Sequence, residues 1–345
     1  ITEAGEAGGC DFDANIEMEG SAHPADSTKL FIYTVHATLT ATPPQDAPYS
    51  LNIQKSIEDS CYNAVFSTVP IGHDCQVVVR ATRTGGWLDG VSTFDLLQTS
   101  KHILNIQPFQ TVWQRLATDV NASNSVTTFD IVETRKLILG IYDTFPAVAS
   151  WRFFRPVADP SNLLSAVKDT YQIVLNNLSD DAFFTNLDFV GVKMGDANLS
   201  AMLTTGGLDD RSGEQPLLLT TDDRFLAAGE TAAIPLRLAK KVLLGGWQIA
   251  LGVDPALATI EGVKGLPSED FVVSGNEVRA LWFDAGGKSY SPESPVFYLK
   301  IKTLQPVRLS QTLFLSNEKL RTEAYVAAGN SLEQRRPMLL RFDEN

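Results

Sequence analysis

Apolar and polar residues alternate along much of the chain, and this period of two predicts β-strands. The alternation is clear between residues 29 and 83, in KLFIYTVHATLTAT, YSLNIQKSI, YNAVFSTV and CQVVVRAT. Pro, Gly and Asp residues separate these runs, so residues 21–83 are expected to form a small β-sandwich. Residues 1–20 are rich in Gly and acidic residues, and we expect them to form an extended N-terminal arm.

The same period returns in residues 217–345, in AAIPLRLA, GGWQIALGV, EVRALWFDA, SPVFYLKIKTL and QTLFLSN. Turns recur about every ten residues, which is typical of an antiparallel sandwich, and RPMLLRFDEN can supply a last strand. Residues 204–216, TTGGLDDRSGEQP, have the composition of a linker. A second β-sandwich after this linker is therefore predicted.

Between the two sandwiches the period becomes helical. GVSTFDLLQTSKHILNI (90–106) aligns with SVTTFDIVETRKLILGI (125–141) at an offset of about 35 residues, which makes an internal repeat. Each copy opens on Ser or Thr before Phe-Asp and ends near a turn residue, Asn105 or Gly140, as helices do. Residues 84–203 are thus expected to form a helical block, and the fold class is mainly β with a small α unit.

The second copy is preceded by side chains that carry oxygen at every second position. A 12-residue calcium loop uses ligands at positions 1, 3, 5, 7, 9 and 12. The residues at these positions are Asp119, Asn121, Ser123, Ser125, Thr127 and Asp130. Gly is usual at position 6, where this sequence has Asn124, the next most tolerant residue of a left-handed backbone. A capping box of Thr127 and Asp130 after a polar loop is the alternative, and both interpretations can hold together.

The first copy has no such loop of its own. With Asp95 at position 12, positions 1, 3 and 5 fall on Thr84, Gly86 and Leu88, two of which lack a side-chain oxygen. Oxygen-bearing side chains with the spacing of positions 1, 3 and 5 occur farther along the chain, in GDANLS. They are Asp196, Asn198 and Ser200. We therefore hypothesise a split site in which Asp196 and Asn198 meet Asp95 around one ion. A separation between the Asp95 and Asp196 carboxylates too wide for one ion would exclude it.

Charge narrows the choice of partners. The net charge of −13 makes a phosphate backbone a poor partner and divalent cations natural ones. No apolar run approaches the length of a membrane span, so none is expected. The first residues, ITEAGEAGGCDF, have neither the basic nor the apolar region of a signal peptide, so a secreted protein would be represented by its mature chain.

The three cysteines are Cys10, Cys61 and Cys75. The last two stand at the ends of CYNAVFSTVPIGHDC, which resembles two short strands around a turn at residues 70–72. A disulfide between them would indicate an oxidising compartment, and three buried thiols are the alternative. With the disulfide formed, Cys10 would be free or bonded to another chain.

At this point the chain resembles a known family. DVNASNSVTTFDIVETRKLILGI is similar to a dockerin repeat, the calcium-binding helix–loop module of cellulosomes. With GVSTFDLLQTSKHILNIQPF, SWRFF and FVGVKMGDAN it resembles a dockerin-like block of large proteins exported by the type IX system. A sandwich of the carboxypeptidase-regulatory type often precedes that block, and residues 21–83 would fill its place. Thr84 and Gly86 depart from the acidic residues that the family carries early in its first loop.

Residues 217–345 resemble a cohesin-type sandwich, in AAIPLRLAKKVLLGGWQIALGVDPALATIEGV and ALWFDAGGKSYSPESPVFYLKIKTL. Cohesins bind dockerins, so the resemblance implies that both kinds of module lie on one chain. It also implies an extracellular or cell-surface location.

No catalytic motif occurs, and the four histidines have no metal-binding spacing, so we do not expect an enzyme. The first interpretation is a calcium-stabilised structural protein whose copies join head to tail into a filament or layer, since heterologous contacts need not close. An adhesin or scaffold that binds polysaccharide or other secreted proteins is the alternative. A glycan-active enzyme with its site in the N-terminal sandwich is a third.

Overall fold

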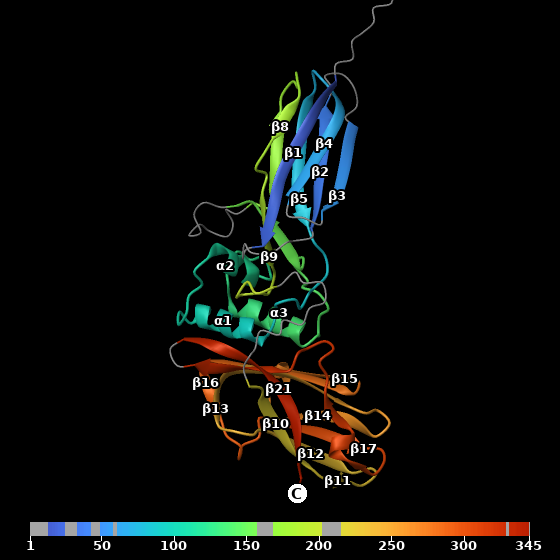
Figure 1. Cartoon of the computed structure of the whole chain (residues 1–345), viewed down its shortest axis with the longest axis vertical. Helices are drawn as coiled ribbons and strands as arrows, with labels where there is room; N and C mark the ends of the chain where they lie inside the picture. The colour runs from blue at the N-terminus through green and yellow to red at the C-terminus, as the bar shows by residue number, and fades with distance from the viewer. Residues whose placement is uncertain are drawn as a thin grey trace, which may run out of the picture. The chain divides into compact units, whose positions relative to one another are not determined.

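The computed structural model describes residues 13–24, 33–42, 49–57, 61–156, 168–201, 215–328 and 331–344. The chain divides into two compact units. The first consists of residues 1–86, 111–116 and 149–194, and the second of residues 87–110, 117–148 and 195–345 (Figure 1). In the described residues no helix is long and apolar enough to cross a membrane. The mainly β fold with a small helical part confirms the predicted fold class.

The first unit contains two sheets, with strand orders β4-β1-β9-β6 and β3-β2-β5-β7, and β8 pairs with β1. The rings of Tyr33 in β2 and Phe153 in β6 lie 6.0 Å apart, so side chains of the two sheets meet in one core. The strands are β1 (Asp13–Pro24), β2 (Tyr33–Thr42), β3 (Tyr49–Ile57), β4 (Cys61–Pro70), β5 (Asp74–Thr82), β6 (Trp151–Phe154), β7 (Thr170–Leu175), β8 (Ala182–Phe184) and β9 (Phe189–Lys193).

Two expected boundaries differ from this arrangement. The expected arm, residues 1–20, runs into β1, which lies inside a sheet between β4 and β9. Residues 1–12 lie outside the described part of the chain. Residues 149–194, expected within the helical block, belong to the first unit, where β7 pairs with β5 and β9 with β1. These strands are short, and partners far away in sequence complete their hydrogen bonding.

The predicted disulfide is absent, because Cys61 is a free, exposed thiol and Cys75 a free, buried one. They belong to β4 and β5, which lie in different sheets. The physical reason is spacing. Cys61 begins the ten-residue β4, whereas Cys75 lies just after the turn that follows it. A strand rises about 3.3 Å per residue and a disulfide needs Cα atoms within about 7 Å, so these two positions cannot meet. Cys10 lies outside the described residues.

The second unit contains a β-sandwich built on a ten-stranded sheet of order β14-β17-β12-β10-β21-β20-β13-β16-β15, with β19 paired to β13. Its strands are β10 (Leu217–Asp223), β12 (Thr231–Leu238), β13 (Val242–Val253), β14 (Ala258–Lys264), β15 (Phe271–Ser274), β16 (Glu277–Tyr290), β17 (Phe297–Thr303), β19 (Leu313–Leu315), β20 (Glu323–Ala328) and β21 (Ser331–Glu344). A small separate pair is formed by β11 (Phe225–Leu226) and β18 (Val307–Arg308).

The last strand closes this sandwich, as predicted from RPMLLRFDEN. The first half of β21 pairs antiparallel with β20, and the second half pairs parallel with β10. The core lies beneath β13, where the fully buried Trp247 stacks on Phe297 and donates a hydrogen bond from Nε1 to the Tyr290 hydroxyl at 3.1 Å. Most of the expected linker, residues 204–216, lies outside the described residues.

The internal repeat forms two helices of equal length, α1 (Thr93–Ile103) and α3 (Thr128–Ile138), and the shorter α2 (Val112–Thr118) lies between them in sequence. Both long helices end as predicted, with Asn105 and Gly140 in the left-handed region. In each helix, the amide of the second residue after the C-cap donates a hydrogen bond to a lysine carbonyl. The pairs are Ile106 to Lys101 and Ile141 to Lys136. This ending satisfies carbonyls that would otherwise lack a partner.

The free thiols give a first prediction. Without prior reduction, alkylation of the native protein should modify Cys61 and spare Cys75, because burial removes the second thiol from solvent and raises its pKa. Mass spectrometry of tryptic peptides measures both. Cys75→Ser is the control, since it should leave the labelling of Cys61 unchanged. A Cys61–Cys75 peptide linkage released only by reductant would contradict the structure.

Candidate functional site

The loop before α3, residues 119–130 (loop 2), is wrapped around the buried carboxylate of Asp119. The Ser123 amide donates to Asp119 Oδ1 at 2.8 Å and to Asn121 Oδ1 at 2.9 Å. The Asn124 amide donates to Asp119 Oδ2 at 2.8 Å. Asn124, at the position where Gly was expected, has a φ of +65°, so the tight left-handed turn is made with Asn.

The far end of loop 2 caps α3. The Thr127 hydroxyl accepts from the Phe129 amide, and Asp130 Oδ2 accepts from the Thr127 amide at 2.8 Å. The capping box is therefore present. However, Asp130 Oδ1 is buried and has no hydrogen-bond partner in the described part of the chain. Burial raises the pKa of Asp130, and the neighbouring Asp119 charge adds to the effect. A cap alone leaves this oxygen unsatisfied, whereas a bound cation would engage it.

The remaining predicted ligands of loop 2 lie on its exposed side. The Ser123 hydroxyl lies 3.1 Å from both the carbonyl and the hydroxyl oxygen of Ser125. The Thr127 hydroxyl lies 3.1 Å from Asp130 Oδ2. All six predicted positions thus belong to one compact loop.

The hypothesised split site is also assembled. We name it loop 1, made of residues 196–201 and 90–95. The Asn198 amide donates to Asp95 Oδ1 at 3.4 Å, which brings the two halves together. Asp95 and Asp196 are both buried, at 1% and 0% exposure. Burial, and next the charge of Asp196, hold the pKa of Asp95 well above its usual range, so the two carboxylates are neighbours. Positions 1, 3 and 5 of the loop are thus occupied by Asp196, Asn198 and Ser200 of the later segment. Thr84, Gly86 and Leu88 do not occupy them.

Loop 1 repeats the hydrogen bonds of loop 2. The Ser200 amide donates to Asp196 Oδ1 and to Asn198 Oδ1, each at 3.0 Å, and the Ala201 amide donates to Asp196 Oδ2 at 2.6 Å. Leu199 and its counterpart Ala122 have the same φ of +56°. In the second half, the Ser92 amide donates to Asp95 Oδ2 at 2.8 Å, as Thr127 does to Asp130.

The break in loop 1 falls between positions 6 and 7 of a twelve-residue loop. Ala201 occupies position 6 and Gly90 position 7, by comparison with Asn124 and Ser125. A Cβ on Gly90 would lie 2.6 Å from the Ala201 Cα, so the two segments are in close contact at this point. The two segments of loop 1, residues 196–201 and 90–95, are far apart in the sequence and are brought together by the fold.

The donor chemistry of both loops fits a calcium ion. In the described residues no three His, Cys, Asp or Glu side chains converge, so each loop combines two carboxylates with amide and hydroxyl oxygens. Calcium accepts six to eight such oxygens, including a backbone carbonyl at position 7, which Ser125 and Gly90 would supply. Sulfur and imidazole ligands, which transition metals favour, are missing from both loops.

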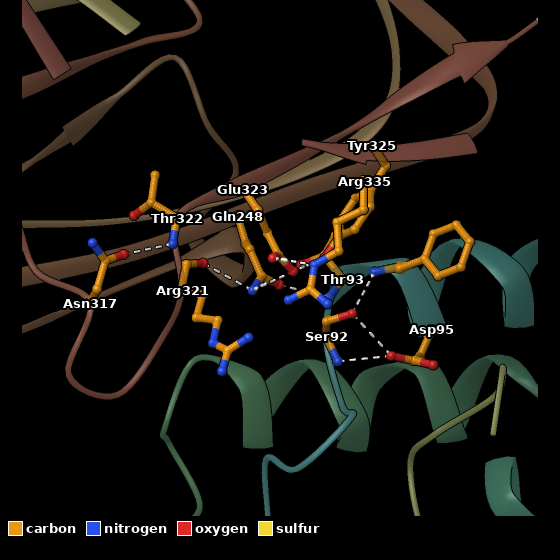
Figure 2. A network of polar contacts seen from close by, with 11 residues as sticks. Ser92, Thr93, Asp95, Gln248, Asn317, Arg321, Thr322, Glu323, Tyr325 and Arg335 are labelled. Carbon is orange, nitrogen blue, oxygen red and sulfur yellow. Dashed lines mark hydrogen bonds and ion pairs between the residues drawn. The ribbon is translucent and has the colours of Figure 1, made fainter. Parts of the chain in front are cut away.

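A contact that the sequence did not predict adjoins loop 1. The start of α1 packs on a group of sandwich residues that we call the docking face: Gln248, Glu323, Tyr325 and Arg335 (Figure 2). The Thr93 amide donates to Gln248 Oε1 at 2.8 Å, and the Phe94 ring stacks on Tyr325 with centroids 5.2 Å apart. Thr93 and Phe94 are the two residues between the loop-1 positions Ser92 and Asp95.

The docking face is itself held by hydrogen bonds (Figure 2). Gln248 Nε2 donates to the Arg321 carbonyl at 3.0 Å, and Glu323 accepts from the Tyr325 hydroxyl at 2.6 Å and from Arg335 Nε at 2.5 Å. Gln248, Glu323 and Tyr325 are buried, and buried polar groups are expensive to desolvate unless they are paired. The network therefore fixes the Gln248 amide in the orientation that receives Thr93.

The other end of the helical pair also contacts the sandwich. Arg135 of α3 lies 3.2 Å from Asp270, and its guanidinium covers the Phe283 ring at 5.4 Å. Burial raises the pKa of Asp270 and Arg135 opposes that rise. The Arg279 guanidinium lies directly against Gly140, so a side chain at residue 140 would have to displace it. Sequence reasoning missed this surface, and only the Thr-Phe pair shared by both repeats gave a signal for it.

Comparisons with known proteins give similarity of fold. No protein-family model matches the chain, and no curated protein matches it. Among solved structures, the chain is similar to the seventh ScaB type I cohesin of Pseudobacteroides cellulosolvens, at 12% identity and a TM-score of 0.26, covering 37% of this chain and 94% of that one. A non-cellulosomal cohesin of Archaeoglobus fulgidus gives 14% identity and a TM-score of 0.22, covering 37% of this chain and 92% of the cohesin. A chain of a cohesin–dockerin complex from Clostridium thermocellum gives 9% identity and a TM-score of 0.26, covering 38% of this chain and 100% of that one.

The close approach of the loop-1 halves gives a second prediction. Gly90→Ala should lower the free energy of unfolding by about 1–3 kcal/mol more than Gly229→Ala, since only Gly90 faces a backbone clash. Gly229 is the matched control, with a φ of +77° against +75° and open space around it. Both variants carry the left-handed strain of about 1–2 kcal/mol. Chemical denaturation measures the difference, and equal losses would show that the halves do not meet.

Proposed function

We propose that this protein is a non-enzymatic extracellular structural protein, that calcium stabilises its helical pair, and that its copies assemble into a cell-surface filament or layer. One observation carries the proposal: a helical repeat with two cation-type loops is docked, through buried polar contacts, on a sandwich of the same chain. Such a unit offers a rigid joint between modules.

Calcium belongs to the proposal on the chemistry of the loops. In the described part of the chain Asp130 Oδ1 makes no hydrogen bond of good geometry, and loop 1 buries two carboxyl groups, those of Asp95 and Asp196. A divalent ion would neutralise each carboxylate pair and fill the coordination that the loop amides leave open. The ion would therefore stabilise the folded chain in proportion to its occupancy.

Assembly requires a contact between copies. Because α1 already covers the docking face, head-to-tail joining through these surfaces requires that the helical pair of one copy occupy the docking face of the next. Exchange of an identical element is a low-cost route to assembly, since the interface is already complementary. Residues 204–216, predicted to be a linker from their composition, separate loop 1 from β10 along the sequence.

The second candidate function is a scaffold or adhesin for other secreted proteins. One observation favours it: in the second repeat, Phe129 occupies the place of Phe94 but is 54% exposed. A partner with a face like the docking face would find an equivalent helix start there. A soluble complex of one copy with a different secreted protein, in place of self-assembly, would support this function.

Calcium stabilisation is tested with loop-2 variants. In calcium at about 100 times the dissociation constant, Asp119→Ala should remove about 2.7 kcal/mol of ion-dependent stability. A further loss of about 1–3 kcal/mol should occur in both conditions, because the Ser123 and Asn124 amides lose their acceptor. Asp130→Ala should lose a similar amount in calcium, plus about 1 kcal/mol in both conditions for the cap. Thermal unfolding with and without chelator measures both.

Asp254→Asn is the control for these variants. Asp254 also accepts a backbone hydrogen bond in a turn, from the Ala256 amide at 2.9 Å, but lies outside both loops. Its effect should be the same with and without calcium. Equal losses in calcium and chelator for Asp119→Ala would show that loop 2 is only a polar turn with a helix cap.

Assembly is tested by electron microscopy of purified full-length protein in calcium. Filaments or sheets should form as the concentration rises and should shorten or dissolve in chelator. The control is the same preparation with Asp119→Ala, which should assemble less. Single, unassociated particles at every concentration in calcium would contradict the structural function.

A further inference from the structure

Loop 1 and the contact with the docking face share one four-residue segment, residues 92–95. Ser92 and Asp95 belong to the ion loop at positions 9 and 12, while Thr93 and Phe94 contact Gln248 and Tyr325. Along this short segment, the Ser92 amide donates to Asp95 and the next amide, that of Thr93, donates to Gln248 of the sandwich (Figure 2). Movement at one contact therefore moves the other, because the intervening bonds are those of one helical turn.

The second repeat shows the same loop without this connection. Thr128 and Phe129 stand where Thr93 and Phe94 stand, yet Phe129 is 54% exposed and packs on no docking face. The backbone hydrogen bonds of the two loops are otherwise alike. Loop 2 is thus an internal control, a cation loop of matching geometry whose own Thr-Phe turn does not contact the docking face; α3 reaches the sandwich only farther along, through Arg135.

Loop 1 also depends on two segments that are far apart in sequence. Asn198 and Asp95 are separated by 103 positions, and the segment 196–201 leads towards β10 and the sandwich. Without a cation the halves are joined by the hydrogen bond from the Asn198 amide to Asp95 Oδ1, and at 3.4 Å this bond is long and weak. With a cation the halves are held together, and the start of α1 takes the shape that the docking face accepts.

We propose that calcium in loop 1 and docking of α1 on the sandwich form one coupled equilibrium. The ion fixes the segment from Ser92 to Asp95, so that Thr93 and Phe94 are presented to Gln248 and Tyr325. Docking in turn raises the calcium affinity of loop 1, because coupling between two sites is reciprocal. Calcium binding to loop 1 then controls whether α1 occupies the docking face, whereas calcium binding to loop 2 stabilises the helices only. This inference rests on the proposed binding of calcium.

The experiment measures calcium affinity in two backgrounds of the full chain. Asp119→Asn leaves loop 1 as the binding loop, and Asp196→Asn leaves loop 2. Gln248→Ala is added to each, since Gln248 is outside both loops. In the Asp119→Asn background it should weaken calcium binding about 5- to 150-fold, the usual range of coupling between sites. In the Asp196→Asn background the affinity should stay unchanged, which also shows that the variant is folded.

Hydrogen exchange supplies the reverse measurement. In the Asp119→Asn protein, calcium should slow amide exchange in β20 at least fivefold, because β20 carries Glu323 and Tyr325. In the Asp196→Asn protein, calcium should leave exchange in β20 unchanged. The two results report on the sandwich side of the contact, which holds no ion.

The outcomes separate the inference from the function on which it rests. If both loops bind calcium but Gln248→Ala leaves the affinity of loop 1 unchanged, the coupling is overturned and calcium stabilisation stands. If calcium slows amide exchange in β20 equally in both backgrounds, the coupling is likewise overturned. If neither background binds calcium, the proposed function and the inference both fail.

Discussion

The contact between Asp95 and the segment 196–201 is the constraint on which the second unit depends. It joins residues 103 positions apart and brings two buried carboxylates together. Closing so long a loop costs chain entropy, and burying like charges costs electrostatic energy. Four backbone amides make five hydrogen bonds to the carboxyl and amide oxygens of this loop and offset part of these costs. A divalent cation would offset the rest, and for this reason the site makes physical sense as a cation loop.

The docking of α1 follows from that constraint. Once the start of the helix is fixed by loop 1, its free Thr93 amide and the Phe94 ring meet a sandwich surface whose polar groups are already oriented. Gln248, Glu323, Tyr325 and Arg335 satisfy one another, so the surface is specific in direction as well as in shape. The equivalent turn of α3 has a similar loop but no such surface, and Phe129 there remains exposed. Two copies of one motif thus have different roles because of what lies beside them.

Local patterns predicted the elements that local interactions stabilise. The repeat gave both long helices, with capping boxes at Ser92 and Thr127 and left-handed ends at Asn105 and Gly140. The ligand spacing located loop 2, whose hydrogen bonds span at most five residues. Patterns failed where partners were distant. Strands β6 to β9 were expected within the helical block, because their order comes from pairing that the local sequence does not show: β8 and β9 pair with β1, β7 with β5, and β6 with β9. The proposed Cys61–Cys75 bond failed because spacing along a chain does not show which sheet each strand enters.

The sequence by itself determined the mainly β class, the two helices of the repeat and the oxygen-rich loop before the second, because each is set by residues within one or two turns of each other. It also contained both halves of loop 1, as separate fragments. Only the tertiary structure decided that the halves join, that α1 rather than α3 lies on the docking face, and that residues 149–194 complete the first unit. The reason is that these outcomes depend on contacts between residues a hundred or more positions apart, which periodicity and motif spacing do not record.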